Sequence, residues 1–344
     1  MTRMKTAVVI LNWNGRGLLE RFLPSVTAYT NGSHGVFVAD NASTDDSVAF
    51  VQANYPQVGI IRLDKNYGFA DGYNRALRQI EADYFCLLNS DVEVTAGWVE
   101  TITSFMDTHP DVAVCQPKLL SQTAKNQFEY AGACGGFIDK FGYPFCRGRM
   151  FSTLEKDEGQ YDQPCDIFWA TGACMFVRSE IYRKLGGLDA DFFAHMEEID
   201  FCWRVKNAGY RIACCPEAVA YHLGGATLSK SSSRKTYLNF RNNWLMLYKN
   251  LPKKRLFPVF ALRWVSDVTA AFRFLLDSGW GDCKAVFKAH RDFLRMLPQT
   301  REKRARINPP DTIRDIYQGH IVIDYFLKGI HTFSKLPFKP ERFH

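Results

Sequence analysis

The sequence lacks the two best-known signatures of nucleotide-binding folds. No GxGxxG motif follows the first predicted strand, residues 6–13, and the P-loop pattern GxxxxGK[ST] does not occur anywhere in the chain. A dinucleotide-binding domain of the usual type and a P-loop nucleotidase are therefore not expected. If this chain binds a nucleotide, it must do so with other residues.

The sequence also contains no CxxC cysteine pair, and we expect neither a signal peptide nor a membrane span. The ten cysteines include no CxxC pair and have no regular spacing, which favours a reduced cytoplasmic protein over a disulfide framework or a zinc site. The first six residues are too short and too polar for a signal peptide. No stretch reaches 18 uncharged apolar residues, so we predict no transmembrane helix.

Charge is distributed unevenly along the 344 residues. Residues 226–344 carry 23 Lys and Arg against 9 Asp and Glu, a net charge of +14, whereas residues 1–225 have a net charge of −7. This asymmetry indicates that the C-terminal part meets something anionic, a membrane surface or nucleic acid, unless it is only a solvated surface. The length and the 47% hydrophobic content suit one large domain with an appendage.

Predicted strands and helices alternate through the first 120 residues. This alternation predicts an α/β fold with a mostly parallel central sheet flanked by helices. The predicted strands are 6–13, 35–39, 58–63, 84–88 and 112–120. A helix is expected after Asn14-Gly15. Further helices are expected from a capping box at Ser43–Asp46 to about Asn54, from about Ala70 to Glu81, and from the cap Thr95 to about Thr108.

The patterns after residue 120 are less regular. Residues 121–165 are rich in glycine, aromatic residues and cysteine without a clear period, which fits either a functional groove or a partly ordered insertion. We predict a strand at 168–177, a short helix capped by Ser179, a helix at 197–208 and a strand at 218–222. Residues 257–276 have the pattern of an amphipathic helix.

Polar residues end three of the predicted strands, and parallel strands would place them at one edge of the sheet. They are Asn12, Asp40 with Asn41, and Asn89 to Asp91. Open α/β sheets bind ligands at this edge, where an Asp can accept from a base N–H or a ribose hydroxyl. Asp91 and Glu93 are oxygen ligands suited to Mg²⁺ or Mn²⁺. The alternative is that Asn89-Ser90-Asp91 is only a turn.

Three acidic residues, Glu197, Glu198 and Asp200, follow the aromatic pair Phe192-Phe193. A carboxylate against an apolar wall tends to have a raised pKa, as a general base requires. The alternative is that the acids only favour the dipole at the start of a helix. Gly172 in a predicted strand suggests the close approach of a ligand or of another backbone.

Taken together, these segments resemble the family 2 inverting glycosyltransferases, especially the rhamnosyltransferase-like members that build bacterial surface polysaccharides. Seven segments match in the family's order and cover roughly residues 5–225. They are VVILNWNG (8–15), VADNASTDDS (38–47), NYGFADGYNRAL (66–77), LLNSDVEV (87–94), ATGACMFVRSEIYRKLGGLDADFF (170–193), EEIDFCWRVKNAGYR (197–211) and YHLGG (221–225).

The resemblance implies the GT-A fold and a role for several residues. Asp40 matches the carboxylate that binds the donor base, Asp91 the last residue of the metal-binding DxD motif, and His222 a histidine that can complete the metal shell. Glu198 falls at the position of the catalytic base, where the family usually has Asp, and Glu197 and Asp200 can share or replace that role. We further assign the donor nucleotide to Asn12, Asn41, Asn66, Gly68 and Asn89, and the acceptor to Trp169 and Gly172.

The resemblance therefore predicts a metal-dependent, inverting transfer of a sugar from a nucleoside diphosphate to a hydroxyl of a lipid-linked glycan. Residues 1–225 would form the catalytic domain, and residues 226–344 a basic, amphipathic helical region. We expect a cytoplasmic protein in peripheral contact with the anionic inner face of the membrane and no specific nucleic-acid partner. The alternatives are a sugar nucleotidyltransferase, although 11–17 does not resemble its Gly-rich basic loop, and a catalytically inactive sugar-nucleotide-binding protein.

Overall fold

The computed structural model describes residues 4–224, 232–277, 279–312 and 315–343. The first strands are β1 (Thr6–Asn12), β2 (His34–Asp40), β3 (Gly59–Arg62), β4 (Tyr84–Leu88), β5 (Val92–Val94) and β6 (Val112–Ser121). The later strands are β7 (Gly136–Ile138), β8 (Pro144–Cys146), β9 (Arg149–Met150), β10 (Thr153–Leu154), β11 (Cys165–Asp166), β12 (Cys174–Arg178) and β13 (Arg211–His222). The five strands predicted in the first 120 residues are all present, and β4 has the predicted bounds.

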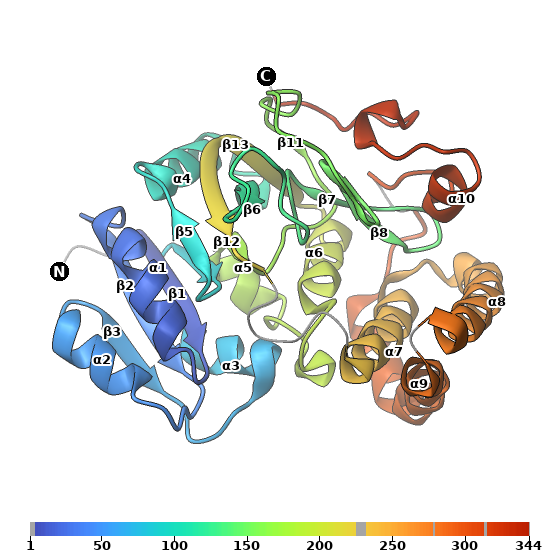
Figure 1. The fold of residues 1–344 in the computed structure, drawn as a ribbon, viewed down its shortest axis with the longest axis horizontal. Coiled ribbons are helices and arrows are strands. Elements are labelled where there is room, and N and C mark those ends of the chain that lie inside the picture. The colour runs from blue at the N-terminus through green and yellow to red at the C-terminus, as the bar shows by residue number, and fades with distance from the viewer. Residues whose placement is uncertain (1–3, 225–231, 278, 313–314, 344) are drawn as a thin grey trace.

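One large sheet organises the molecule (Figure 1). Its strand order is β11-β13-β6-β12-β4-β1-β2-β3, and β5 also pairs with β13. The neighbours β4, β1, β2 and β3 are parallel, as predicted. β12 runs antiparallel to both β4 and β6, so its first residue lies beside the last residue of β4. The sheet is therefore mixed, with its parallel part at the N-terminal side.

Helices cover both faces of the sheet because its strands alternate between two cores. Val8 and Ile10 of β1 face the core beneath α1, α2 and α4, whereas Ala7 and Val9 face the core beneath α3, α5 and α6. The helices in chain order are α1 (Arg16–Ala28), α2 (Ser47–Asn54), α3 (Gly68–Leu77), α4 (Trp98–Thr108), α5 (Ser179–Lys184) and α6 (Glu197–Asn207). Short 3-10 turns lie at Ala190–Phe192 and Phe333–Lys335.

Two predicted helix caps are wrong. α2 begins at Ser47, and the Ser43 hydroxyl instead accepts from Asn12 Nδ2 and from the N–H of Asn14. α4 begins at Trp98, and the Thr95 hydroxyl donates to the carbonyl of Val219 on β13. In both cases a partner distant in sequence competes successfully for the side chain.

Three other predictions need correction, and the last of them is a third helix cap. Residues 121–165 are not irregular, because they contain a four-stranded antiparallel sheet of order β10-β9-β8-β7. The predicted strand 168–177 forms only from Cys174 onward. Ser179 begins α5 as predicted, but its hydroxyl donates to the Ala82 carbonyl and does not cap the helix.

The C-terminal region consists of α7 (Ser233–Asn250), α8 (Lys253–Asp277), α9 (Trp280–Ile307) and α10 (Ile321–Phe326). α7 packs against both α6 and α9. The last residues return to the large sheet and its neighbouring segments, where Lys140 N donates to the Tyr317 carbonyl and Asp166 N to the Glu341 carbonyl. One hydrophobic core contains side chains from both predicted parts, such as Phe201 and Leu245.

The predicted division after residue 225 falls at the edge of 225–231, so Gly225 and this boundary lie outside the described residues. The two-part organisation stays a prediction. Within the described residues, no helix is both long enough and apolar enough to cross a membrane.

Candidate active site

The polar ends of β1 and β2 form a hydrogen-bonded cluster at the carboxyl edge of the sheet. Asn12 lies opposite Asp40 in the strand register. Its Nδ2 donates to Asp40 Oδ1 (3.2 Å), Ser43 Oγ (3.1 Å) and Ser47 Oγ (2.9 Å), while Asp40 Oδ2 accepts from the Ser43 N–H (3.1 Å). Asn12 Oδ1 is buried without a donor, which leaves an acceptor for a ligand in this corner.

Asn41 links this cluster to the turn that opens α3. Its Oδ1 accepts from the Tyr67 N–H, and its Nδ2 donates to Asn66 Oδ1 and to the Gly68 carbonyl. Asn66 Oδ1 also accepts from the Gly68 N–H. The fold therefore brings together five of the residues predicted to bind the donor nucleotide, along neighbouring strand ends: Asn12, Asp40, Asn41, Asn66 and Gly68. Asn41 holds the turn through its own hydrogen bonds.

Asp91, His222 and Glu129 form a buried row behind β5. His222 ends β13 opposite Val92, and its Nε2 lies 3.1 Å from Asp91 Oδ1 and 3.5 Å from Asn89 Nδ2. On the other side of the ring, Nδ1 lies 3.2 Å from Glu129 Oε1. Burial lowers the pKa of His222, but the hydrogen bonds and charges of Asp91 and Glu129 outweigh burial and raise it to about 10.

The donor atoms of Asp91 and His222 fit a divalent metal held jointly with a ligand. One carboxylate and one imidazole nitrogen meet at the strand ends, and both atom types bind first-row divalent ions. Among the described residues, no three His, Cys, Asp or Glu side chains are arranged to hold a metal ion by themselves. Glu93 is not available for this site, because it pairs with Lys125 at 2.8 Å.

Sequence reasoning missed Glu129, which lies in the segment predicted to be irregular. Its Oε2 accepts from the N–H of Ala131, and its side chain is 5% exposed. A carboxylate fixed in this way can orient the imidazole of a metal-binding histidine. No periodic pattern marks position 129, so only the tertiary contact with His222 identifies it.

The start of β12 connects this row to the acidic helix. The Asn89 N–H donates to the Ala173 carbonyl at 2.9 Å. A Cβ built on Gly172 would lie 3.9 Å from Glu198 Cβ and 3.0 Å from the Phe69 ring. The missing side chain of Gly172 therefore lets the Phe69 ring pack closely beside Glu198, and the acceptor role of Gly172 stays a prediction. Trp169 does not fit that role, since it is 4% exposed and its Nε1 donates to the Phe137 carbonyl.

The three acidic residues of α6 have different environments. Glu198 is partly exposed, and burial raises its pKa to about 7 although the backbone N–H groups at the helix start oppose the shift. Glu197 is buried, and burial together with the charge of Glu198 raises its pKa well above the ordinary value. Asp200 is fully buried and bonded to Arg204 (2.9 Å), Lys249 (2.8 Å) and Asn250 (2.8 Å).

These environments favour Glu198 as the base. Part of its side chain is exposed, whereas Glu197 and Asp200 are buried. Glu198 Oε2 itself is buried and, like Glu197 Oε2, has no hydrogen-bond partner. Asp200 is already paired with two cations, which makes it an anchor between α6 and the C-terminal helices.

The loop before α6 is strained. Phe193, His195 and Met196 all have positive φ values, 63°, 70° and 71°. Such conformations cost of order 1 kcal/mol or more each for a residue other than glycine, and they persist only where surrounding contacts hold them. The Phe193 carbonyl accepts from the N–H groups of Phe69 and Ala70 at 2.9 and 3.3 Å, so this loop also touches the start of α3.

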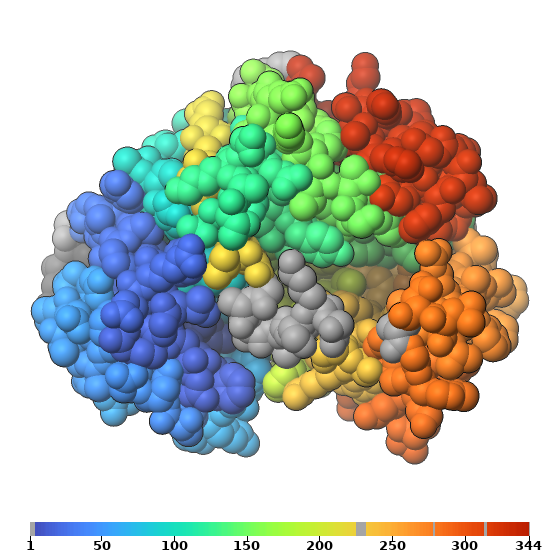
Figure 2. Space-filling view, in the orientation of Figure 1, coloured from blue at the N-terminus to red at the C-terminus, as the bar shows by residue number. Residues whose placement is uncertain are grey.

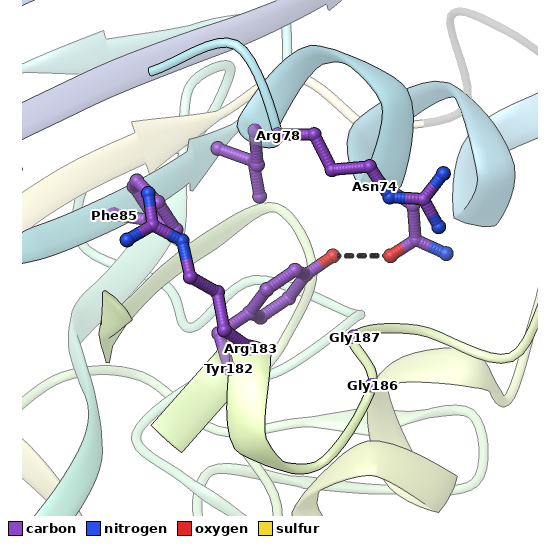
Figure 3. A pocket seen from close by; sticks show the side chains of 8 residues that line it. Asn74, Arg78, Phe85, Tyr182, Arg183, Gly186 and Gly187 are labelled. Atoms are coloured by element: carbon purple, nitrogen blue, oxygen red, sulfur yellow. Dashed lines mark hydrogen bonds between the residues drawn. The ribbon is translucent and has the colours of Figure 1, made fainter. Parts of the chain in front are cut away.

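A separate pocket of about 310 Å³ lies between α3, α5 and β4 (Figure 3). Its lining residues are Asn74, Leu77, Arg78, Phe85, Tyr182, Arg183, Gly186 and Gly187. Figure 3 shows Tyr182 donating to Asn74 Oδ1 at 2.8 Å. None of the predicted site residues lines this pocket, and Phe85 lies towards the amino end of β4. We therefore assign the chemistry to the carboxyl edge of the sheet.

Comparison with known families and proteins identifies glycosyltransferases as relatives of this chain. Residues 7–186 match the model of the family described as glycosyl transferase family 2. A Mycobacterium tuberculosis N-acetylglucosaminyl-diphospho-decaprenol L-rhamnosyltransferase is 25% identical over 231 residues, which cover 62% of this chain and 75% of that protein. The rhamnosyltransferase WbbL of Escherichia coli is 23% identical over 225 residues, covering 62% and 82%.

Solved structures share the fold at low sequence identity. The GalNAc-T7 structure with UDP, GalNAc and Mn²⁺ aligns with a TM-score of 0.58 and 14% identity, over 87% of this chain and 58% of that one. Staphylococcus aureus TarS 1–349 with UDP-GlcNAc gives 0.55 and 16%, over 89% of both chains. The Pyrobaculum calidifontis mannosyltransferase PcManGT with GDP-Man and Mn²⁺ gives 0.51 and 14%, over 90% and 86%.

The structural neighbours are GT-A glycosyltransferases, which confirms the predicted fold class. The family match covers more than half of the 344 residues. The chain therefore belongs to glycosyl transferase family 2 and is a glycosyltransferase with the GT-A fold.

Proposed function

We propose that this protein transfers a sugar, with inversion, from a nucleoside diphosphate to a hydroxyl of a lipid-linked glycan in the synthesis of a cell-surface polysaccharide. The observation that carries the proposal is the arrangement along the sheet edge: Asp40 at the donor corner, Asp91 with His222 in the middle, and Glu198 beside Gly172. The decaprenol-linked acceptor named for the mycobacterial relative and the nucleotide sugars in the neighbouring structures support it.

The chain's own residues supply positions for each part of the reaction. Asp40 and Asn12 would bind the donor nucleotide, and Asp91 with His222 would hold Mg²⁺ or Mn²⁺. Such an ion neutralises charge on a leaving diphosphate. Glu198 accepts the proton of the acceptor hydroxyl, whose oxygen attacks the anomeric carbon from the face opposite the diphosphate. One new C–O bond forms as the bond to the diphosphate oxygen breaks, so a single displacement inverts the configuration.

The proposal is tested by incubating the protein with a panel of nucleoside-diphosphate sugars and a polyprenyl-diphosphate-linked saccharide, with and without Mn²⁺. We expect one donor to release its nucleoside diphosphate and to extend the acceptor with inverted configuration. Pyrophosphate-dependent formation of a sugar nucleotide would instead indicate the nucleotidyltransferase. Binding of a donor without any release of nucleoside diphosphate would indicate an inactive binding protein.

Replacing Asp40 should weaken binding of the donor nucleotide. Asp40→Ala removes a charged hydrogen-bond acceptor at the end of β2, so we expect a loss of about 1–3 kcal/mol in nucleoside-diphosphate affinity by calorimetry. The matched control is Asp64→Ala, because Asp64 lies just after β3 but is exposed, and its carboxylate accepts from the Tyr67 hydroxyl. Unchanged affinity in folded Asp40→Ala would remove Asp40 from the donor site.

We further propose that α8 and α9 contact an anionic membrane. Eight large apolar side chains on these helices are exposed to solvent: Phe257, Trp264, Val265, Phe272, Leu276, Trp280, Phe287 and Leu294. Trp280, Phe287 and Leu294 are seven residues apart and therefore share one face of α9. The exposed side chains of Lys284, Lys288, Arg291 and Arg295 accompany them.

The charge of this face selects the partner. A second copy of the chain would bring like charges together, whereas anionic lipid complements them. Figure 2 shows α8 and α9 (orange) on the side of the molecule opposite the first three strands (blue). A membrane there would lie against α8 and α9, which pack on α7, and α7 packs on α6. An acceptor carried by lipid would already be at that surface.

Vesicle flotation tests this contact. Each Lys or Arg near the surface contributes roughly 1 kcal/mol, so the double variant Lys284→Glu with Lys288→Glu should bind anionic vesicles at least about 30-fold more weakly. The control is Lys65→Glu with Lys156→Glu, which makes the same charge change on exposed residues of the N-terminal part. Equal recovery of the wild-type protein with neutral and anionic vesicles would contradict the membrane contact.

A further inference from the structure

Asn242 lies where α7 meets the strained loop that precedes the two glutamates. It is fully buried, and its Nδ2 donates to the carbonyl oxygens of Phe192 (2.9 Å), Ala194 (2.9 Å) and His195 (2.7 Å). A single amide group thus holds three carbonyls of one short loop. The segment 241–243 was expected to be helical from its sequence, but no function assigned above uses it.

Arg241 fixes the direction in which the Asn242 amide points. Its Nε and Nη2 donate to Asn242 Oδ1 at 2.9 and 2.7 Å, and Nη2 also donates to the carbonyls of Asp191 and Phe192. A guanidinium can only donate, so Oδ1 must face Arg241 and Nδ2 must face the loop. The two residues therefore act as one unit.

The loop that they hold contacts both sides of the candidate active site. On the donor side, the Phe193 carbonyl accepts from the N–H groups of Phe69 and Ala70. On the other side, Met196 directly precedes α6, which begins with Glu197 and Glu198, and its carbonyl accepts from the Asp200 N–H. A change in the loop would therefore move both the start of α3 and the base.

We propose that Asn242, oriented by Arg241, is a positioning residue that sets the conformation of residues 193–196 and thereby the placement of Glu198. The strained φ values within this segment need such an external restraint, and the three convergent hydrogen bonds supply it. This inference rests on the proposed function for the role of Glu198. It makes the C-terminal region a part of the catalytic apparatus and not only a membrane contact.

The test compares Asn242→Ala with Asn243→Ala in the full chain. Asn243 is the next residue of α7 and is also buried, but its Nδ2 donates to the Gly142 carbonyl (3.1 Å), away from the loop. We expect Asn242→Ala to raise amide hydrogen exchange in peptides covering 66–72 and 190–198. It should lower kcat about 10–100-fold, with a smaller rise in the donor KM because the start of α3 belongs to the proposed donor site. Asn243→Ala should leave exchange in both peptides and kcat near wild type.

Equal exchange in the two variants, or faster exchange with unchanged kcat, would overturn the proposal. If Asn242→Ala does not fold, Arg241→Ala replaces it, since this change frees Asn242 Oδ1 and two loop carbonyls and should give the same exchange pattern. If the wild-type protein transfers no sugar, the proposed function fails, and the exchange measurement alone then supports or overturns the restraint on the loop.

Discussion

Glu198→Gln should lower kcat by about 10²–10⁴-fold, the usual contribution of a general base, with nearly unchanged donor affinity. The substitution keeps the size of the side chain beside Gly172 and removes its ability to accept a proton. Burial raises the pKa of Glu198 to about 7, and the base must be ionised. Wild-type kcat should therefore increase as pH rises through about 7, and it should decrease at pH values below 7. Steady-state kinetics across pH 5.5–8.5 provide the measurement.

The neighbouring acids are the controls for this assignment. Glu197→Gln should retain turnover within about tenfold, because burial and the charge of Glu198 raise the pKa of Glu197 and so favour its protonated form, which Gln resembles. When folding raises the pKa of a carboxyl, the folded protein loses stability as pH rises above the ordinary pKa of that carboxyl, which is 4.5 for Glu197. Glu197→Gln should therefore raise the melting temperature at pH 7.

Asp200→Asn should act on stability, since removing one partner of a buried ion pair costs about 3–5 kcal/mol. Full turnover in Glu198→Gln, with loss in either neighbour, would move the base to that neighbour. Full turnover in all three variants would show that none of these acids is the base. Their role would then be limited to stabilising the start of α6.

Asp91→Ala should abolish metal-dependent turnover, with a loss of about 10²–10³-fold, the cost of removing one group that stabilises developing charge. Asp91 Oδ1 lies 3.1 Å from His222 Nε2. The described residues contain no three His, Cys, Asp or Glu side chains that could hold a metal by themselves, so loss of Asp91 should leave too few protein ligands. The measurement is donor turnover with increasing Mn²⁺, together with Mn²⁺ binding by calorimetry in the presence of nucleoside diphosphate.

Glu93→Ala is the matched control for Asp91→Ala. Glu93 is only two residues away and carries the same charge, but its carboxylate pairs with Lys125. It should retain turnover and metal binding. If the wild-type protein keeps its full rate in excess EDTA, the site is metal-free, and Asp91 has a different role. Circular dichroism of both variants separates loss of metal binding from loss of fold.

The architecture of the first half could be predicted from the sequence because buried strands and amphipathic helices each impose a regular local pattern of apolar and polar residues. A buried parallel strand must be apolar along its length and must end in residues that can face solvent or a ligand, so 84–88 and the polar residues after it were recognisable. The same logic placed Asn12 and Asp40 side by side, which the strand register confirms. The order of the seven motifs then indicated the family.

Helix caps and irregular segments were harder to predict because a side chain with several possible partners takes the best one that folding brings near. Ser43 and Thr95 have residue types that commonly cap helices, yet each bonds to a distant strand end or strand. Tryptophan is a residue type that often contacts ligands, but Trp169 packs against Gly136 and is buried.

The sequence by itself determined which chemical groups are present and which strand ends carry them. Only the tertiary structure decided which of them share a site. His222 meets Asp91 across 131 positions, Glu129 meets the other side of the same ring, and Asn242 meets the loop before Glu198 across 47 to 50 positions. The pKa of a carboxyl depends on what packs around it. The difference between Glu197, Glu198 and Asp200 therefore arises from burial and ion pairing, which are properties of the folded chain and not of the order of its residues.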